Sequence, residues 1–350
     1  MELLSVTMKD GVKPRSEIEG KDNSSEDKSN YKIVRKGDMV YNSMRMWQGA
    51  NGISPCDGIV SPAYTVLMPK QEINNGYFAA LFKSANLINE FRKNSQGMTS
   101  DTWNLKYPQI ETIKVQVPSV SEQDKVSELF GVLDARIVAQ AQLIEALKKY
   151  KRGVNNQILS QIDNSYNCRL GSVCEIVGGG TPDTLHTEYW GNTVEWFTPS
   201  EIGKTKYVNN SVRKLSDIGL DNSSAKLLPI GTVLLTTRAT LGEMSIAKRE
   251  CSTNQGFQSL IPHTDRVSSE YLYYMQIIIK PWCEKYASGN TFREISKSAL
   301  SDCIIPIPDR ARQEQIVKLL SSIDMLIGAA ESISMSLSKI RHGLMQQLFI

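Results

Sequence analysis

The sequence predicts an α+β protein: two mixed α/β globular domains separated by two long antiparallel helices that form a coiled-coil spacer. Three observations lead to this fold class. A long heptad stretch occurs twice, the globular segment before each copy also repeats, and 41% of the 350 residues are hydrophobic, which suits buried cores. We expect globular domains at 1–118 and 161–308, and spacer helices at 119–160 and 309–350.

Apolar residues recur with a heptad period in both long stretches. Each position after Pro118 matches the position 190 residues later, and the spacing of four, three, four and then seven residues is typical of a coiled coil. We predict that the two stripes pack on each other, because a lone helix of about 60 Å could not bury its stripe. The predicted coiled-coil seam comprises Val126, Phe130, Leu133, Ile137, Leu147, Val154 and Ile158 in the first helix and Ile316, Leu320, Ile323, Ile327, Leu337, Leu344 and Leu348 in the second.

The seam is less apolar at three matched positions. Such polar residues cost stability but restrict register and partner choice. The alternative is that each helix is an independent amphipathic helix on its own domain, although globular helices average only about 11–12 residues. The less apolar pairs are Gln140 with Ala330, Ile144 with Ser334, and Lys151 with Arg341.

The globular segments repeat as well. "YKIVRKGDMVYNSMRM" from Tyr31 aligns with "AKLLPIGTVLLTTRAT" from Ala225, which places Gly37 on Gly231. Each stretch predicts a β-branched strand entered through a turn glycine. Later in each copy an amphipathic helix leads to a Gly-containing polar loop and then to a short apolar strand that ends in proline, at Pro118 and Pro308.

The two copies differ at their start. Residues 161–308 number 148 and residues 1–118 number 118, so the first copy is about 30 residues shorter. The segment without a counterpart is "QIDNSYNCRLGSVCEIVGGGTPDTLHTEYW". We expect the first domain to be shortened by truncation or re-initiation of the gene; alternatively, that domain folds without the opening strand.

Composition excludes several protein classes. A net charge of +3 does not by itself indicate nucleic acid as a partner. The six cysteines are scattered without a C-x-x-C pair, which argues against a metal site or a disulfide framework. The N-terminal residues do not resemble a signal peptide, and no apolar run reaches about 18 residues. We expect a cytoplasmic protein without a membrane partner.

Catalytic motifs are also missing. The chain has no Pro-Pro, so it lacks the Asn/Asp-Pro-Pro-aromatic stretch of an adenine methyltransferase. "TPSEIGKT" at 198–205 has threonine where a phosphate-binding loop needs its first glycine. His186, His263 and His342 are far apart, and Asp10 with "EGK" at 19–21 is a weak nuclease-like pairing in a polar stretch. We expect no catalytic residues.

The chain resembles the specificity subunit of type I restriction-modification systems. The similar phrases are "LGSVCEIVGGGTPDTLHTEYWGNTVEWFTPSEIG" and "IPIPDRARQEQIVKLLSSIDMLI" in the second half, with "YNSMRMWQGANGISPCDGIVSPAYTVL" and "VPSVSEQDKVSELFGVLDARI" in the first. The resemblance implies that each globular domain is a target-recognition domain reading one half of a split double-stranded DNA target. The shortened first domain puts recognition of its half-site in doubt.

The resemblance also implies the partners. Two DNA methyltransferase (modification) subunits would dock on the long helices, with "KKYKR" at 148–152 as a candidate surface, and a restriction/translocase subunit would join them. The chain would hold no cofactor itself, because S-adenosylmethionine, ATP and Mg²⁺ belong to the partner subunits. Methylation of a flipped adenine would be their reaction. The competing interpretation is a non-catalytic coiled-coil adaptor that binds only protein and reads no DNA.

Polar residues after the repeated strands are candidates for DNA contact. Arginine pairs with guanine, asparagine or glutamine pairs with adenine, and the threonine methyl suits thymine. Polar loops that contain glycine are a second usual place for such groups. "GGGTP" at 178–182 either approaches a phosphate or is a plain turn. Trp47, Thr240 and Arg249 lie beside the main candidates, which are Asn42, Arg45, Gln48, Thr237, Arg238, Lys248, Asn254, Gln255, Asn290, Arg293 and Lys297.

Overall fold

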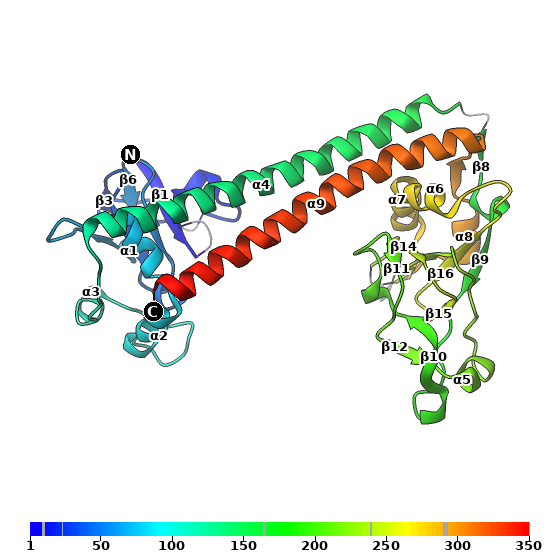
Figure 1. Cartoon of the computed structure of the whole chain (residues 1–350), viewed down its shortest axis with the longest axis horizontal. Helices are drawn as coiled ribbons and strands as arrows, with labels where there is room; N and C mark the ends of the chain where they lie inside the picture. Colours follow the sequence, from blue (N-terminus) through cyan, green and yellow to red (C-terminus); the bar gives the residue numbers. More distant parts are fainter. Residues whose placement is uncertain (9–10, 23, 164–165, 239, 290–292, 350) are drawn as a thin grey trace. The chain divides into compact units, whose positions relative to one another are not determined.

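The computed structural model describes residues 1–8, 11–22, 24–163, 166–238, 240–289 and 293–349. The chain divides into two compact units: unit 1 comprises Met1–Ile144 and Ala329–Ile350, and unit 2 comprises Glu145–Gly328. Both units mix helices and strands (Figure 1), which confirms the predicted α+β class. Within the described residues, no helix combines the length and the apolar character needed to cross a membrane.

Unit 1 contains two small sheets. The described strands form one sheet in the order β2-β1-β6-β3, with β1 and β6 parallel, and a second in the order β5-β4-β7. Its strands are β1 (Glu2–Thr7), β2 (Gly11–Pro14), β3 (Lys32–Val34), β4 (Met39–Asn42), β5 (Asn51–Ile53), β6 (Gly58–Val60) and β7 (Tyr64–Leu67), and its short helices are α1 (Asn75–Leu81), α2 (Ala85–Asn94) and α3 (Tyr107–Ile110).

Unit 2 repeats this plan with additional strands. The described sheets have the orders β12-β10-β15, β11-β14-β13-β16-β9 and β17-β8. The strands are β8 (Asn167–Arg169), β9 (Cys174–Gly178), β10 (Trp190–Phe197), β11 (Tyr207–Val208), β12 (Arg213–Leu215), β13 (Val233–Leu235), β14 (Met244–Ala247), β15 (Cys251–Thr253), β16 (Gln258–Pro262) and β17 (Ile304–Pro306); the short helices are α5 (Asp217–Asp221), α6 (Ser269–Tyr274), α7 (Gln276–Tyr286) and α8 (Lys297–Ser301).

The repeat extends to individual backbone positions. Gly37 and Gly231 both have the left-handed backbone expected of turn glycines, with φ of 92° and 86°. β4 pairs antiparallel with β5 and β7, as β13 does with β14 and β16. Asn74 caps α1 by accepting from the Tyr77 N–H, and Ser268 caps α6 by accepting from the Tyr271 N–H. The two units are therefore built on one template.

Two long helices follow the globular segments, as the heptad pattern predicts. They are α4 (Val120–Gln161) and α9 (Arg310–Leu348). Ser119 and Glu122 form reciprocal side-chain-to-backbone bonds at the start of α4, and the Asp309 carboxylate accepts from the Arg312 N–H at the start of α9. Both helices thus begin just after the matched prolines, where side chains satisfy the free N–H groups.

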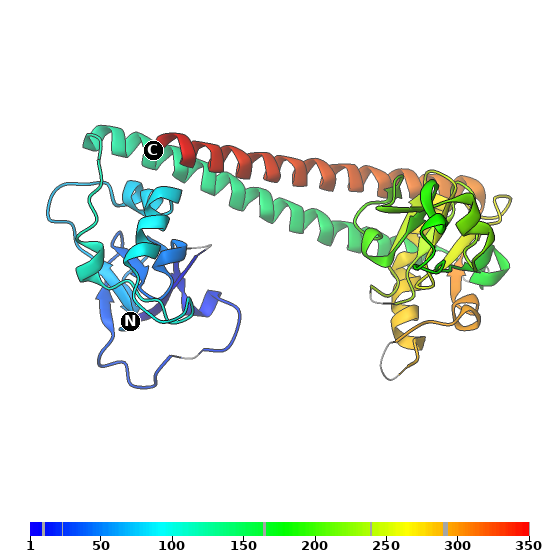
Figure 2. The ribbon, with the colours of Figure 1, turned by 90° about the horizontal axis from the view of Figure 1, so that it is seen from below.

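Within each unit the α4 and α9 segments lie side by side and run antiparallel (Figures 1 and 2). In unit 1 the Gln140 amide donates to the Ala330 carbonyl at 3.0 Å, and Arg341 forms an ion pair with Asp134. In unit 2 Lys151 forms an ion pair with Asp324 at 2.5 Å. The polar seam residues Gln140, Lys151 and Arg341 therefore each bind the opposite helix.

Most of the predicted seam residues are buried or half-buried. The unit 2 core includes Ile158 and four α9 residues, with Leu147 and Val154 packed against it. The unit 1 core includes Phe130, with Val126 and Leu344 packed against it. Leu133 is also buried, whereas Ile137 and Leu337 are half-buried. The four α9 residues are Ile316, Leu320, Ile323 and Ile327.

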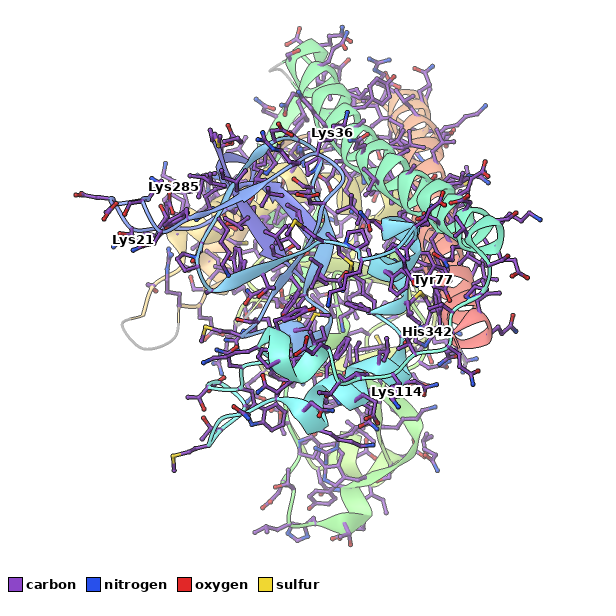
Figure 3. All side chains as sticks on the ribbon, turned by 90° about the vertical axis from the view of Figure 1, so that its left-hand side faces the viewer. Lys21, Lys36, Tyr77, Lys114, Lys285 and His342 are labelled. Atoms are coloured by element: carbon purple, nitrogen blue, oxygen red, sulfur yellow. The ribbon has the colours of Figure 1, made fainter. Side chains whose placement is uncertain are left out.

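The assignment of Leu348 to the seam is wrong. Its side chain is 43% exposed, whereas Met345 and Phe349 are buried. The Phe349 ring stacks on Phe130 at 5.7 Å and meets the edge of Tyr77 at 5.4 Å. Figure 3 shows Tyr77 beside this end of α9. The globular domain therefore decides which side of the last helical turn is buried, and a strict seven-residue count does not continue to the helix end.

The apolar strand expected before Pro118 is also a wrong prediction. Residues 113–117 have irregular backbone, and Val115 and Val117 are 37% and 39% exposed. The matched segment in unit 2 is β17, which pairs with β8. Since β8 belongs to the segment that the first copy does not contain, residues 113–117 have no such strand to pair with among the described residues, and a strand needs a partner for its backbone hydrogen bonds.

Candidate functional site

The end of β13 and a polar loop meet in unit 2. The Arg238 guanidinium lies 2.8 Å from the Glu294 carboxylate, and both side chains are partly exposed. The Thr237 N–H donates to the Gly256 carbonyl, which brings the loop after β15 to the same place. We call Thr237, Arg238, Asn254, Gln255 and Glu294 the strand-end cluster.

The amide side chains of the strand-end cluster are held by local bonds. The Asn254 side-chain Oδ1 accepts from the Gly256 N–H at 2.9 Å, and the side-chain oxygen of the exposed Gln255 accepts from the Thr181 hydroxyl. A half-buried asparagine and an exposed glutamine thus stand near a guanidinium, and these are the side-chain types that read guanine and adenine edges.

The structure does not support the prediction that Thr237 contacts DNA. Its side chain has no exposed surface, and its hydroxyl donates to the Glu294 carboxylate at 3.4 Å. A fully buried threonine cannot reach a base edge, so its part is to hold the loop against the strand. The sequence analysis did not select Glu294, because carboxylates are unusual DNA ligands. Its place one residue after the candidate Arg293 was the sequence feature that could have indicated it.

Lys248 and Arg249 lie away from the strand-end cluster. In the β13–β14 pair, Leu235 faces Met244 whereas Val233 faces Ile246, so residues after Ala247 lie beside the start of β13 rather than its end. The Lys248 ammonium sits 4.3 Å from the centre of the Tyr207 ring. The structure thus separates these two residues from the other unit 2 candidates.

The loop after α7 carries three of the predicted DNA-contact residues, and the structure describes two of them. Ser288 and Glu294 form an antiparallel bridge that closes it. The Arg293 side chain is exposed and donates to the Glu284 carbonyl, and Lys297 is exposed at the first residue of α8. Asn290 lies outside the described residues.

Unit 1 presents a matching arrangement. Gln96 and Asn104 bridge a loop of the same kind, and the Leu105 N–H ties that loop to the Ser43 carbonyl at 2.8 Å. Trp47 and Trp103 meet edge to face at 5.1 Å. Sequence reasoning missed Trp103, although it stands 190 residues before Arg293, a position that the repeat already marked.

The remaining unit 1 candidates lie within five residues of Trp47 in the chain, and the Trp47 indole N–H donates to the Met44 carbonyl at 3.1 Å. Asn42 accepts from the Met44 N–H, and Arg45 donates weakly to the Met44 carbonyl at 3.5 Å. Gln48 ends the short 3-10 turn Met46–Gln48, and all three candidates are half-buried. Half-buried polar side chains thus lie on the same short segment as one member of an aromatic pair, and the combination of polar and aromatic groups suits contact with nucleic acid bases.

"KKYKR" at 148–152 does not form one outward face. Lys148, Lys151 and Arg152 line a cavity of about 750 Å³ in unit 2; Lys148 and Lys151 are half-buried, whereas Lys149, Tyr150 and Arg152 are exposed. The Lys151 ammonium is also 5.4 Å from the centre of the Tyr274 ring, and the Tyr274 hydroxyl donates to Asp324 at 2.9 Å. Only part of the predicted docking surface is therefore available on the helix exterior.

The triple glycine is packed inside unit 2. A Cβ on Gly179 would lie 2.0 Å from the Asn254 carbonyl oxygen, and a Cβ on Gly180 would lie 2.3 Å from the Ser224 hydroxyl. The Gly180 carbonyl accepts from the Trp196 indole N–H at 3.0 Å. These glycines allow close packing against the loop that carries Asn254. This packing role is neither of the two interpretations that the sequence left open, a phosphate contact or a plain turn.

One carboxylate beneath this region is buried and paired. Glu195 accepts from Lys214 at 2.7 Å and from the Ser211 N–H and hydroxyl. Burial by itself would raise the pKa of Glu195, but these hydrogen bonds outweigh it, so the pKa lies below its usual range. Glu195 is therefore ionised at neutral pH and fixes β10 to the chain before β12.

One family model matches most of this chain. A family model described as "Type I restriction modification DNA specificity domain" matches residues 6–149 and 163–335. The type I restriction enzyme MjaIX specificity subunit of Methanocaldococcus jannaschii is 35% identical over 186 residues, covering 52% of this chain and 43% of that protein. The EcoR124I/EcoR124II specificity subunit of Escherichia coli is 26% identical over 231 residues, covering 61% and 56%. The chain thus spans about half the length of these two relatives.

Solved structures show the same fold. The S subunit of a type I restriction-modification system from M. genitalium superposes with a TM-score of 0.58 at 15% identity, covering 91% of this chain and 84% of that one.

Proposed function

The chain belongs to the family of type I restriction-modification DNA specificity domains, and from this premise we propose that it is the DNA-reading subunit of such a complex. It binds a bipartite double-stranded DNA target and positions methyltransferase and restriction subunits on it. The chain itself catalyses nothing; the partners carry S-adenosylmethionine, ATP and Mg²⁺ and methylate adenine. The cytoplasm, where such DNA lies, is the proposed location.

The observation that carries this proposal is the recurrence of one polar site in both units. The strand-end cluster of unit 2 and the tryptophan-centred site of unit 1 occupy matched positions between a strand end and a bridged loop. The side chains differ, which suits two domains that read different half-sites. We propose that Arg238, Asn254, Gln255 and Arg293 contact DNA in unit 2 and that Asn42, Arg45 and Gln48 do so in unit 1.

We further propose that α4 and α9 form a coiled-coil spacer between the target-recognition domains at 1–118 and 161–308. The antiparallel contacts within each unit support this, from Phe130–Phe349 and Asp134–Arg341 in unit 1 to Lys151–Asp324 in unit 2. A rigid spacer fixes the unread gap between half-sites, whereas a flexible linker would tolerate variable gaps. Two methyltransferase subunits would dock on its exposed faces.

Sequencing of the DNA methylome with and without the gene tests the function directly. The expected result is one split motif that loses its adenine methylation when the gene is deleted and regains it on complementation. An unchanged methylome in a host with active partner subunits would contradict the proposal and favour the protein-binding adaptor.

A binding titration tests the residues. The complex with its methyltransferase subunits is titrated with the split DNA target at several salt concentrations, and affinity should fall steeply as salt rises. Arg238→Ala should weaken binding by about 1–3 kcal/mol and relax specificity at one base pair. Lys248→Ala is the matched control, because it removes a cation at the other end of β13. Equal effects of the two changes would contradict the assignment to the strand-end cluster.

A further inference from the structure

The matched polar sites of the two units differ in charge. At three positions beside the strand end, unit 2 has charged residues and unit 1 has uncharged ones. The repeat matches Arg238 with Met44, Arg293 with Trp103, and Glu294 with Asn104. The ion pair between Arg238 and Glu294 is thus replaced by two uncharged side chains in unit 1. Unit 1 therefore keeps the place of the site but not its charges.

Backbone contacts support this match. The residue before Met44 and the residue before Arg238 are each bonded to the polar loop of their unit. Trp103 and Arg293 each stand just before the residue whose bridge closes that loop. The two pairs of positions therefore lie at equivalent places between the strand end and the loop.

Large apolar side chains lie at the unit 1 site. The Trp47 indole N–H donates to the Met44 carbonyl at 3.1 Å, and the Trp47 and Trp103 rings meet edge to face at 5.1 Å. Both tryptophans are half-buried, and Met44 is 41% exposed. Met98, in the loop that the bridge closes, is 100% exposed. We call Met44, Trp47, Met98 and Trp103 the apolar patch.

A cation lies beside the apolar patch. The guanidinium carbon of the exposed Arg92 is 5.8 Å from the centre of the Trp47 ring. A guanidinium in this place is suited to a backbone phosphate, which positions a protein on duplex DNA, while the neighbouring side chains face the base edges. The patch occupies the place in unit 1 that the strand-end cluster occupies in unit 2, so DNA is the partner that its position indicates.

The chemistry of base edges determines what such a patch can select. In the major groove the thymine C5-methyl group is the apolar feature, and the other groups on the base edges are hydrogen-bond donors or acceptors. An apolar side chain against a donor or acceptor leaves that group without a partner, which is unfavourable. Contact with a methyl group instead removes apolar surface from water and is worth about fourfold in affinity.

We infer that the apolar patch of unit 1 reads thymine through its 5-methyl group, whereas the arginines of unit 2 read acceptor edges. This inference rests on the proposed function and specifies the base that one of the two domains selects. It follows from the replacement of Arg238 and Arg293 by Met44 and Trp103 at matched places, since the replaced residues can no longer donate to guanine.

Replacement of thymine by deoxyuridine tests this inference, because it removes only the methyl group. The complex of the chain with its methyltransferase subunits is titrated with the split target found by methylome sequencing, each thymine being replaced singly. At one thymine or more, affinity should fall about fourfold. At the same position a 5-methylcytosine·guanine pair should bind more tightly than a cytosine·guanine pair, because the methyl group is restored.

Variants of the chain assign the methyl group to the apolar patch. Met44→Ala and Trp103→Ala should each reduce the effect of the same deoxyuridine replacement to less than about twofold, because partners in contact are not additive. Met68→Ala, at an 82% exposed methionine of unit 1 outside the patch, is the matched control and should leave the effect unchanged. Thermal melts check that the variants fold.

The outcomes separate this inference from the proposed function. Specific binding that no deoxyuridine replacement weakens, or a thymine effect that neither patch variant reduces, would overturn the inference and leave the proposed function intact. Loss of complex assembly in Met44→Ala would also overturn it, since the patch would then contact a protein subunit. Failure of the complex to bind any split DNA would overturn the proposed function and this inference with it.

Discussion

A glutamine in the first turn of each long helix makes the same bonds in both units. The Gln123 side chain accepts from the Asn74 N–H and donates to the Pro118 carbonyl. Gln313 accepts from the Ser268 N–H and donates to the carbonyls of Pro308 and Arg266. Both side chains are buried, at 2% and 1% exposure. One amide thus joins each long helix to the cap of the neighbouring short helix.

Replacement of Gln313 by leucine should destabilise unit 2. The change leaves buried backbone groups without partners, so we expect the free energy of unfolding to fall by about 1–3 kcal/mol. Urea denaturation followed by tryptophan fluorescence measures it. Gln315→Leu, at an exposed position two residues away, is the control and should change little; equal losses would contradict this account.

Glu195 should make unit 2 sensitive to acid. Its pKa is lowered in the folded state, so its contribution is present above the unfolded pKa of about 4.3 and is lost as pH falls through the folded value. Glu195→Gln should therefore lower the free energy of unfolding at pH 7. The variant's stability should also decrease less steeply than that of the unchanged chain as the pH falls below about 4. Thermal melts across pH 3–7 test this, with the exposed Glu175→Gln expected to leave the slope unchanged.

At the scale of elements, the cross-helix ion pairs follow the repeat but differ in support. Asp134 in α4 matches Asp324 in α9, and Lys151 in α4 matches Arg341 in α9. Each ion pair therefore joins an aspartate on one long helix to a cation on the other, and the two pairs are equivalent by the repeat. In unit 2 the Tyr274 hydroxyl also donates to Asp324, whereas Ala80 stands at the matched position in unit 1. The same helix contact is therefore more strongly bonded in unit 2.

Removal of the two aspartates should have unequal effects. Asp134→Ala loses a partly exposed ion pair and should cost at most about 1 kcal/mol. Asp324→Ala also removes the hydrogen bond from the Tyr274 hydroxyl to the carboxylate, which leaves that hydroxyl with Ser321, and should cost about 2 kcal/mol. Chemical denaturation of the two variants provides the comparison. A larger loss for Asp134→Ala would contradict the argument from Tyr274.

At the scale of the whole molecule, the proposed spacer links two domains built on one template. Because both long helices begin at matched prolines and keep one register, a length change must be made in both helices to preserve their pairing. The length of the helices, rather than the chemistry of either domain, should then determine the gap between half-sites.

Insertion of seven residues into both α4 and α9 tests this idea. Seven residues lengthen a helix by about 10 Å, or about three base pairs of duplex DNA. Methylome sequencing should find the same half-sites with a longer gap. A matched four-residue insertion rotates the apolar stripe and should abolish methylation; an unchanged gap after the seven-residue insertion would contradict the spacer.

The sequence by itself determined the repeat, the strands around Gly37 and Gly231, and the helices that begin after Pro118 and Pro308. These features follow from local periodicity and from glycine and proline geometry, which neighbouring residues encode. Only the tertiary structure decided that Thr237 is buried, that Phe349 replaces Leu348 against the core, and that residues 113–117 form no strand. Burial and strand pairing depend on segments distant in the chain, and no local pattern specifies which distant segment is present.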